Sequence, residues 1–331
     1  MIVRGGIALN FKESQLITYA TPLSATEEER CKNAIRMIRD AMKLVGYTDN
    51  NKEIRSYETD TWAFSLDLHG DMGKKIVLLV QGSYANNTNI RTQSDVDVAV
   101  ILESTFIPEY RIEVTKKSYN FTDGTFTAQK LKDEVESALK RKFNGEGVER
   151  KDKSIKVHGN SYRVDADVVP AYRFRDYRED YHFDANNYVG GIEIRPDSGG
   201  NIINYPEQHI KNGRAKNNAT NYCFKKHVRI MKKMKQLMLD YEYSSPKNVS
   251  SFGLESLLWN IPNAVYAKYP SVYRYTFDEL IIHLRGDFDN FGTCKEANGI
   301  KTLFPTTSDR ENYKTFIIAL SDFYQYDIQE A

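Results

Sequence analysis

The sequence predicts an α+β protein in which a mixed sheet flanked by helices is followed by a helical C-terminal lobe. Two observations support this fold class. Apolar runs with the two-residue alternation of strands occur before residue 205, and apolar residues at helical spacing dominate after residue 211. We therefore assign residues 1–210 to a core domain that includes the N-terminal helix, and residues 211–331 to a C-terminal helical domain.

A long helix is predicted before the sheet. Thr26 and Glu29 form a capping-box pattern, and apolar residues then recur at helical spacing until Gly46 ends the helix. We expect this helix to bridge the two lobes. Residues 62–68 alternate as a strand does, and residues 127–145 carry a second amphipathic helical pattern, whose apolar side should cover the sheet.

The apolar strand that follows residue 75 ends at a turn made of Gln81, Gly82 and Ser83. Glycine lets the backbone approach a triphosphate closely, and successive N–H groups together with the serine hydroxyl can bind phosphate oxygens. A Gly-Ser pair by itself usually marks only a turn. Because two acidic residues follow on the next strand, these three residues are candidate nucleotide-binding residues.

The two acids stand at alternate positions of a predicted strand, residues 94–102. Because side chains on a strand alternate between faces, Asp95 and Asp97 share one face, while the valines between and after them point into a buried layer. The Cα atoms of the two acids should lie roughly 6 to 7 Å apart, so both carboxylates can reach a pair of divalent ions about 4 Å apart. Oxygen ligands suit magnesium.

A third carboxylate can come from a predicted hairpin. Residues 155–157 lead through a turn into a strand that carries Asp165 and Asp167 on one face. We expect Pro170 to end this strand because proline cannot donate to a strand ladder. Either aspartate is a candidate for a third metal ligand, and the alternative for Asp165 is an ion pair with one of the arginines at positions 163–175.

A further hairpin and four helices complete the predicted elements. The turn signal at residues 197–200 separates two short strand-like runs, 192–194 and 202–204. Helical patterns then occupy residues 218–240, 251–261, 271–285 and 308–329. The last of them starts with a capping-box pattern at Ser308 and Glu311. These four segments form the predicted helical lobe.

The Gly-Ser turn after an apolar strand, followed about a dozen residues later by a strand with an Asp-x-Asp pattern, resembles the signature of the DNA polymerase β-like nucleotidyltransferase superfamily. Asp167 directly precedes Val-Val-Pro-Ala, which is similar to the third-acid strand of oligoadenylate synthases and of bacterial cGAS/DncV-like nucleotidyltransferases, called CD-NTases. The resemblance implies a polymerase β-like nucleotidyltransferase core. It also implies that Asp95, Asp97 and Asp167 are catalytic and bind two magnesium ions, with manganese as the alternative.

The same resemblance assigns nucleotide contacts in the helical lobe. Arg229 and Lys232 match an Arg-x-x-Lys pattern that contacts the donor triphosphate in these families. Ser251 matches a serine that contacts the triphosphate, and Phe252 matches an aromatic residue that stacks on the donor base. The cGAS-like enzymes commonly carry tyrosine where this chain has phenylalanine, which keeps stacking but lacks the hydroxyl. From local pattern alone, the cations can form a solvated basic face, Ser251 a helix N-cap and Phe252 part of a core.

Composition excludes several classes of protein. Lys and Arg number 46 and Asp and Glu 45, so the net charge of +1 provides no global field toward nucleic acid, and activation by nucleic acid is disfavoured. Three widely separated cysteines support neither a disulfide framework nor a zinc cluster. No apolar run approaches the roughly 20 residues that cross a bilayer, and the N-terminus lacks the pattern of a signal peptide. We expect a cytoplasmic protein without membrane association.

The expected function is magnesium-dependent synthesis of a cyclic di- or trinucleotide second messenger from nucleoside triphosphates. The resemblance implies bacterial anti-phage (CBASS) signalling, in which a downstream effector senses the product. Residues 327–331 are a candidate site for a regulatory partner at the C-terminal tail. Two rivals stay open: a linear nucleotidyltransferase that acts on RNA or a small-molecule acceptor, and a nucleotide-binding scaffold whose site has decayed.

Overall fold

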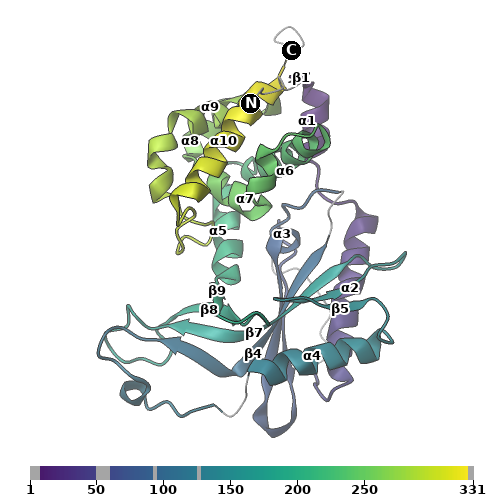
Figure 1. Cartoon of the computed structure of the whole chain (residues 1–331), viewed down its shortest axis with the longest axis vertical. Coiled ribbons are helices and arrows are strands. Elements are labelled where there is room, and N and C mark those ends of the chain that lie inside the picture. Colours follow the sequence, from purple (N-terminus) through teal and green to yellow (C-terminus); the bar gives the residue numbers. More distant parts are fainter. Residues whose placement is uncertain (1–7, 50–59, 92–94, 125–127, 327–331) are drawn as a thin grey trace. The chain divides into compact units, whose positions relative to one another are not determined.

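The computed structural model of the chain describes residues 8–49, 60–91, 95–124 and 128–326 (Figure 1). The chain divides into two units. The sheet unit comprises residues 24–86 and 93–210, and the helical unit comprises residues 1–23, 87–92 and 211–331. We assigned residues 8–23 and 87–91 to the core domain, but they group with the helical unit. None of the described helices is both long enough and apolar enough to cross a membrane.

An eight-stranded mixed sheet forms the centre of the sheet unit. Its strands are β2 (Ser65–His69), β3 (Lys75–Gln81), β4 (Val96–Glu109), β5 (Val148–Arg150), β6 (Ile155–Val157), β7 (Ala166–Asp176), β8 (Val189–Ile194) and β9 (Ile202–Asn204). The order is β2-β3-β4-β7-β6-β5, and β8 and β9 continue from the far half of β7. Strands β4 and β7 run parallel, and the other described pairings of this sheet are antiparallel. The predicted mixed sheet and the hairpin of β8 and β9 are confirmed.

The helices of the sheet unit follow the predicted pattern. Helices α2 (Ala25–Lys43) and α4 (Ala128–Lys142) pack on each other and on β7, and Figure 1 draws both alongside the sheet. The short helix α3 (Gly82–Ala85) follows β3, and two 3-10 turns, η1 (Asp71–Gly73) and η2 (Lys116–Tyr119), lie in loops. Helix α5 (Pro206–Ala219) spans the sequence boundary between the two units.

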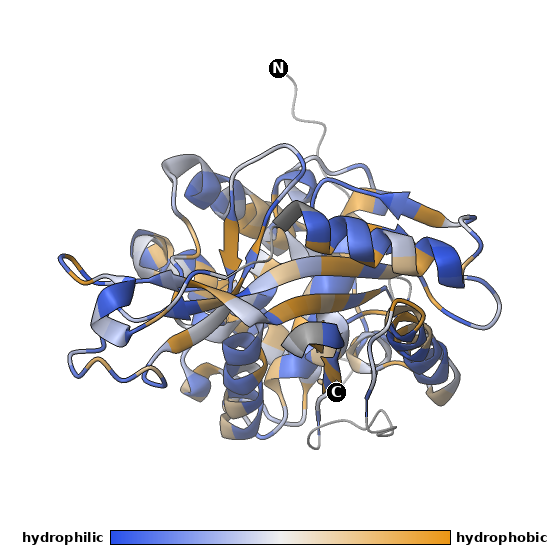
Figure 2. Ribbon diagram, turned by 90° about the horizontal axis from the view of Figure 1, so that it is seen from below, coloured by the Kyte–Doolittle hydropathy of each residue, from blue (hydrophilic) through white to orange (hydrophobic). Residues whose placement is uncertain are grey.

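Both faces of the sheet bury apolar side chains. One face carries the cluster Val77, Leu79, Ala99, Ile101, Val169, Ala171, Ile192 and Ile194. On the other face, Val96, Val98 and Val100 are fully buried, as the two-residue alternation predicted. Figure 2 shows the apolar residues of the central strands in orange, while much of the helical surface is blue. Since positions 97, 99 and 101 alternate with those valines, Asp97 stands on the first face, at the end of its apolar cluster.

Two helix starts differ from prediction by two residues. The capping box of α2 is formed by Ser24 and Glu27, whose side chains each accept from the other's backbone N–H. The box of α10 (Thr307–Phe323) is formed in the same way by Thr306 and Asp309. The chain segment at the start of each of these helices contains two overlapping Ser/Thr-x-x-acid patterns, and the earlier pattern forms the cap in each case.

The prediction that Pro170 ends the strand was wrong. Strand β7 continues through Pro170 to Asp176. Strand β6 pairs with β7 only as far as Val168, and β8 pairs with it only from Tyr172. Pro170 therefore lies where β7 has no partner strand on that side among the described residues, and a missing N–H donor is tolerated there. The strand also begins at Ala166, later than expected.

The helical unit has one apolar core. Its helices are α1 (Glu13–Ala20), α6 (Phe224–Asp240), α7 (Ser251–Asn260), α8 (Asn263–Tyr266), α9 (Tyr273–Gly286) and α10, with the 3-10 turns η3 (Ser245–Asn248) and η4 (Phe288–Thr293). The four predicted helical segments correspond to α6, α7, α9 and α10. Strand β1 (Leu9–Asn10) pairs in parallel with β10 (Tyr324–Gln325). Phe11 and Leu16 are buried in the core of the C-terminal helices, which explains why the N-terminal residues join this unit.

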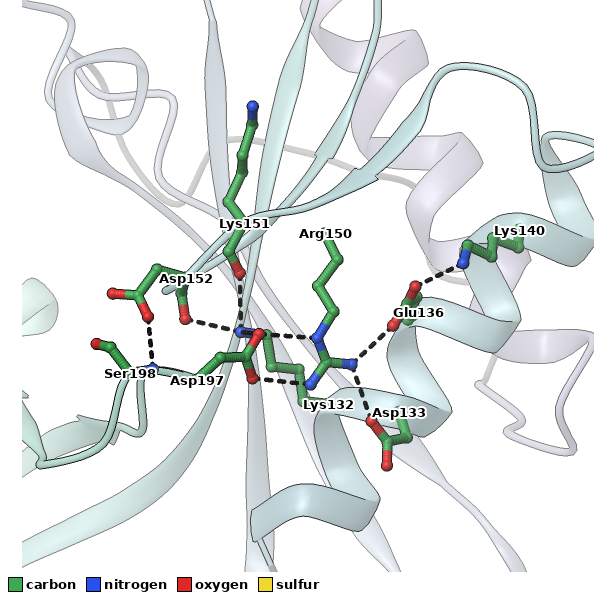
Figure 3. A network of polar contacts seen from close by, with 9 residues as sticks. All are labelled: Lys132, Asp133, Glu136, Lys140, Arg150, Lys151, Asp152, Asp197 and Ser198. Carbon is green, nitrogen blue, oxygen red and sulfur yellow. Dashed lines mark hydrogen bonds and ion pairs between the residues drawn. The ribbon is translucent and has the colours of Figure 1, made fainter.

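A network of charges ties α4 to the turns of two hairpins (Figure 3). Arg150 of β5 donates to both carboxylate oxygens of Asp197 at 2.8 Å and to Glu136 of α4 at 2.7 Å. Lys132 Nζ lies 2.8 Å from Asp197 Oδ2 and donates to two backbone carbonyls of the turn after β5. Asp197 thus joins the β8–β9 turn to α4 and to the β5–β6 hairpin.

Asp197→Asn should destabilise the fold in a pH-dependent manner. Hydrogen bonds from Arg150 and Lys132 hold the pKa of Asp197 well below its usual range. A depressed folded-state pKa stabilises the protein above the unfolded pKa of about 3.9, and this stabilisation is lost as the pH falls. Urea unfolding midpoints should therefore be lower for the variant at pH 7, with the difference shrinking from pH 5 toward pH 2. Asp123→Asn is the control, because Asp123 forms an exposed pair with Lys116. This variant should change neither the urea midpoint at pH 7 nor its dependence on pH. A difference in urea midpoint between Asp197→Asn and the wild type that stays the same at every pH would contradict the stabilising role of the ionised Asp197.

Candidate active site

Two parallel strands bring the predicted acids together. Asp97 of β4 and Asp167 of β7 are direct register partners, so their side chains share one face of the sheet. Asp95 and Asp165 stand two residues earlier, just before each strand, and Val96 N donates to the carbonyl oxygen of Asp165 at 3.1 Å. The two Asp-x-Asp patterns thus enter the sheet side by side.

The electrostatics of Asp95 reflect this convergence. Its pKa is raised by burial and by the charges of Asp165 and Asp167, while Lys156 acts in the opposite direction. Lys156 Nζ lies 3.9 Å from Asp95 Oδ2. Within the described residues, no three His, Cys, Asp or Glu side chains are already arranged as a metal centre. The acids nevertheless bring carboxylate oxygens together at the edge of the sheet, with the ammonium of Lys156 among them.

Asp165 and Asp167 have different surroundings. Lys156 Nζ lies 2.8 Å from Asp165 Oδ2, and Gly159 N donates to Asp165 Oδ1 at 2.6 Å. These two bonds outweigh burial and lower the pKa of Asp165. We expected any ion pair of Asp165 to involve an arginine, and Lys156 takes that place. Asp167 Oδ1 accepts from Ser154 Oγ at the long distance of 3.4 Å.

The Gly-Ser turn lies directly against Asp97. Gln81 ends β3 as the register partner of Asp97, and Gly82 follows with a φ of +70°. A Cβ atom on Gly82 would lie 2.2 Å from Asp97 Oδ2, so only glycine fits this carboxylate and this backbone conformation. Ser83 is the second residue of α3, half-buried. The turn and the acid were predicted separately, and the structure brings them into contact.

Asn86 is a site residue that sequence reasoning missed. Its Nδ2 donates to the carbonyl oxygen of Gly82 at 2.9 Å and lies 3.3 Å from His209 Nδ1. The side chain is fully buried. Asn86 therefore fixes the backbone of the Gly-Ser turn through its hydrogen bond to Gly82. Its position as the residue after a one-turn helix gives a cap signal, but its partner His209 is 123 residues away and leaves no local trace.

The predicted cations of α6 are buried within the helical unit. Arg229 donates through Nε to the carbonyl oxygen of Ala20 at 2.6 Å and through Nη1 to that of Asn87. Arg229 and Lys232 are only 4% and 6% exposed. The alternative of a solvated basic face is therefore wrong. Both side chains hold the unit together, and their contact with a triphosphate stays a prediction.

Lys232 belongs to a buried ion pair. Its Nζ lies 2.8 Å from Glu255 Oε2 of α7 and 3.1 Å from Thr88 Oγ1, and Thr88 also donates to Glu255 at 2.8 Å. All three side chains are buried. Asn87 and Thr88, which follow the Gly-Ser turn in sequence, are thus bound to α6 and α7 by this triad together with the Arg229 contact.

Glu255→Gln should destabilise the chain strongly. The change leaves Lys232 as an uncompensated buried charge, which costs about 3 to 5 kcal/mol. A fall of the urea midpoint without a change in the slope would measure this. Glu311→Gln is the matched control, because Glu311 pairs with Lys314 at the surface and is 61% exposed; its effect should stay within about 0.5 kcal/mol. Equal midpoints for the two variants would refute the assignment.

Ser251 and Phe252 open helix α7. The N-cap is Ser250, whose Oγ accepts from Gly253 N at 2.8 Å, so the N-cap alternative for Ser251 was misplaced by one residue. Phe252 is 40% exposed, which excludes the alternative of a core aromatic residue. An exposed ring at the start of a helix suits stacking on a base. The nucleotide contacts of both residues stay predictions.

Comparison with known proteins identifies relatives of both units. The family model described as cGAS/DncV-like nucleotidyltransferase C-terminal helical domain matches residues 211–325, and a nucleotidyltransferase domain matches residues 66–185. Cyclic GMP-AMP synthase CdnE03 of Staphylococcus schleiferi is 41% identical over 317 residues, which cover 96% of this chain and 97% of the relative. The cyclic dipyrimidine nucleotide synthase CdnE of Cecembia lonarensis is 34% identical over 293 residues, which cover 88% of this chain and 90% of the relative.

Solved structures agree with these relatives. The CdnE cyclic dinucleotide synthase of Elizabethkingia meningoseptica, determined with GTP and Apcpp, aligns with a TM-score of 0.70 and 30% identity over 93% of this chain and 97% of that one. The predicted recognition and the nucleotidyltransferase fold are confirmed. With both units matched and relatives covering nearly the whole chain, this nucleotidyltransferase belongs to the cGAS/DncV-like nucleotidyltransferases, the CD-NTases.

Proposed function

We propose that this enzyme joins nucleoside triphosphates into a cyclic di- or trinucleotide second messenger in a reaction that requires magnesium. The observation that carries the proposal is the register pairing of Asp97 with Asp167 beside the Gly-Ser turn. The relatives support the cyclic product, because those that cover nearly the whole chain are cyclic nucleotide synthases. Free nucleotides as substrates are also consistent with the near-zero net charge of the chain.

The residues of the acid cluster fit a divalent ion. Asp95, Asp97 and Asp167 supply only oxygen donors, which suits magnesium or manganese. The positively charged ammonium of Lys156 lies beside these acids, so the cluster already accommodates one cation. We assign the three aspartates to two ions. When bound, such ions supply charge neutralisation and lower the pKa of the attacking hydroxyl.

The remaining predicted residues would bind the donor nucleotide. Gln81, Gly82 and Ser83 form a turn whose backbone N–H groups can bind phosphate oxygens. Ser251 would touch the triphosphate, and the exposed ring of Phe252 would stack on the donor base. Arg229 and Lys232, which we assign from the resemblance to the family, would contact the triphosphate and neutralise part of the charge that the ions leave on it.

Product analysis tests this function. The purified enzyme is incubated with magnesium and each of the four ribonucleoside triphosphates, singly and in pairs, and the products are treated with phosphatase before mass analysis. A cyclase gives phosphatase-resistant material from free nucleotides alone. Products that require an RNA or small-molecule acceptor, or that keep a digestible end, would favour the linear transferase. Absence of magnesium-dependent pyrophosphate release would favour a decayed scaffold.

The biological partners follow from the cyclic product. We propose CBASS anti-phage signalling in the cytoplasm, with an effector that senses the product. Nucleic-acid activation is disfavoured by the net charge of +1. A regulatory partner at residues 327–331 also stays a proposal, and those residues lie outside the described part of the chain. Loss of a conjugate after truncation of this tail, in cells that carry the neighbouring genes, is the expected result.

A further inference from the structure

A lysine stands inside the acid cluster. Lys156 is the central residue of β6 and lies directly opposite Asp167 in the antiparallel register of β6 and β7. Its ammonium lies 2.8 Å from Asp165 Oδ2 and 3.9 Å from Asp95 Oδ2. The side chain is 24% exposed. Four carboxylates and one ammonium therefore share this edge of the sheet, on three neighbouring strands and the residues that lead into them.

Asp165 is held on its other side by its own hairpin. Gly159 N donates to Asp165 Oδ1 at 2.6 Å. The loop passes so close that a Cβ atom on Gly159 would lie 2.7 Å from the backbone nitrogen of Asp165. One carboxylate oxygen thus accepts from the loop and the other from Lys156. Asp165 is fixed by residues 156–159 from both directions.

Asp167 is not fixed in this way. Its described hydrogen bond, from Ser154 Oγ, is long at 3.4 Å. Two aspartates that the sequence pattern could not distinguish therefore differ in their partners, because Asp165 is held by Lys156 and by the Gly159 N–H. Lys156 also places a positive charge near Asp95, one of the acids assigned to the ions.

We propose that Lys156 is a positioning residue of this enzyme, which keeps Asp165 out of the ion site and sets the net charge that the ions meet. The inference rests on the proposed function, because it concerns the assigned ion ligands. With Lys156 present, Asp165 is neutralised, and Asp95, Asp97 and Asp167 bind the ions. Without it, Asp165 becomes a fourth negative group beside them.

The inference gives an ordered charge series. Lys156→Gln makes the cluster one unit more negative, and Asp165→Asn makes it one unit less negative. The double variant restores the wild-type net charge. Because a unit charge a few Å from a divalent ion changes its binding substantially, we expect each single change to shift manganese affinity on the order of tenfold, in opposite directions. The double variant should return to within about threefold of wild type.

The experiment measures binding rather than turnover. Free Mn²⁺ is titrated against the full chain by electron paramagnetic resonance, without nucleotide, for the wild type and the three variants. The expected order of affinity is Lys156→Gln tightest, then wild type and the double variant together, then Asp165→Asn. Lys156→Arg keeps the charge and should bind as the wild type does. Lys151→Gln is the matched control, because Lys151 lies in the same hairpin but pairs with Glu149.

Two further results separate this inference from the proposed function. If Asp97→Asn abolishes binding while Lys156→Gln binds as the wild type does, the role of Lys156 is refuted and the ion site stands. If the wild type binds no Mn²⁺, or Asp97→Asn leaves binding unchanged, the ion site itself is refuted. Equal weakening by all variants, accompanied by lower melting temperatures, would indicate a purely structural role and would also overturn the inference.

Discussion

Replacing Asp97 by asparagine is expected to lower product formation by at least about a thousandfold while leaving the fold intact. The carboxylate is assigned to both ions, and charge stabilisation by bound ions is worth several kcal/mol, with each 1.36 kcal/mol equal to a factor of ten. Asp97 is also the centre of the site, since Gln81 and Asp167 are its register partners on either side. Asp167→Asn should have a comparable effect.

The fold of these variants provides the internal control. Removing one negative charge from a cluster of carboxylates relieves repulsion, so the melting temperature should be equal to or higher than that of the wild type. Asp67→Asn is the comparison, because Asp67 is an exposed strand aspartate that pairs with Lys75 at 2.9 Å, away from the acid cluster. It should retain full turnover. Product formation by Asp97→Asn at more than about a tenth of the wild-type rate would refute the metal assignment.

The face of the sheet on which Asp97 lies could be predicted because the information is local. Period-two alternation fixes Asp97 on the face opposite Val96 and Val98, and the structure places those valines in a fully buried layer. The same alternation could not separate Asp165 from Asp167, because both lie on one face. What separates them is Lys156 of β6, which stands opposite Asp167 in the strand register but whose ammonium pairs with Asp165. Strand register between distant segments leaves no signal in a single sequence.

The helical unit illustrates a second limit of sequence reasoning. Arg229 and Lys232 stand one turn apart and outside the apolar positions that we took as the buried side of α6, so the pattern alone left them free to form a solvated basic face. The structure buries both, because Ala20, Asn87 and Glu255 supply acceptors from three separate segments. The membership of residues 8–23 in this unit was missed for the same reason. Contacts between distant segments decided both outcomes.

Gly82→Ala is expected to lower turnover by about a hundredfold or more, because the added methyl group occupies the position of the Asp97 carboxylate, which we assign to the ions. Its Cβ would lie 2.2 Å from Asp97 Oδ2 and 3.1 Å from Asp97 Cγ, so the carboxylate must move by more than an ångström. A displacement of about 1 Å at a reacting group can cost a factor of about a hundred. The turn must also keep a φ of +70°, which disfavours alanine by roughly 1 to 2 kcal/mol.

A second glycine separates these two effects. Gly145, just beyond α4, has a φ of +74°, and a Cβ atom there would meet nothing within 4 Å. Gly145→Ala therefore carries the same backbone strain without a clash, and it should lose stability but keep its turnover. The melting temperature should fall for both variants because of this strain, while product formation and Mn²⁺ binding should fall only for Gly82→Ala. Similar turnover in both variants would mean that Asp97 tolerates displacement, and the close contact between turn and acid would then have no catalytic role.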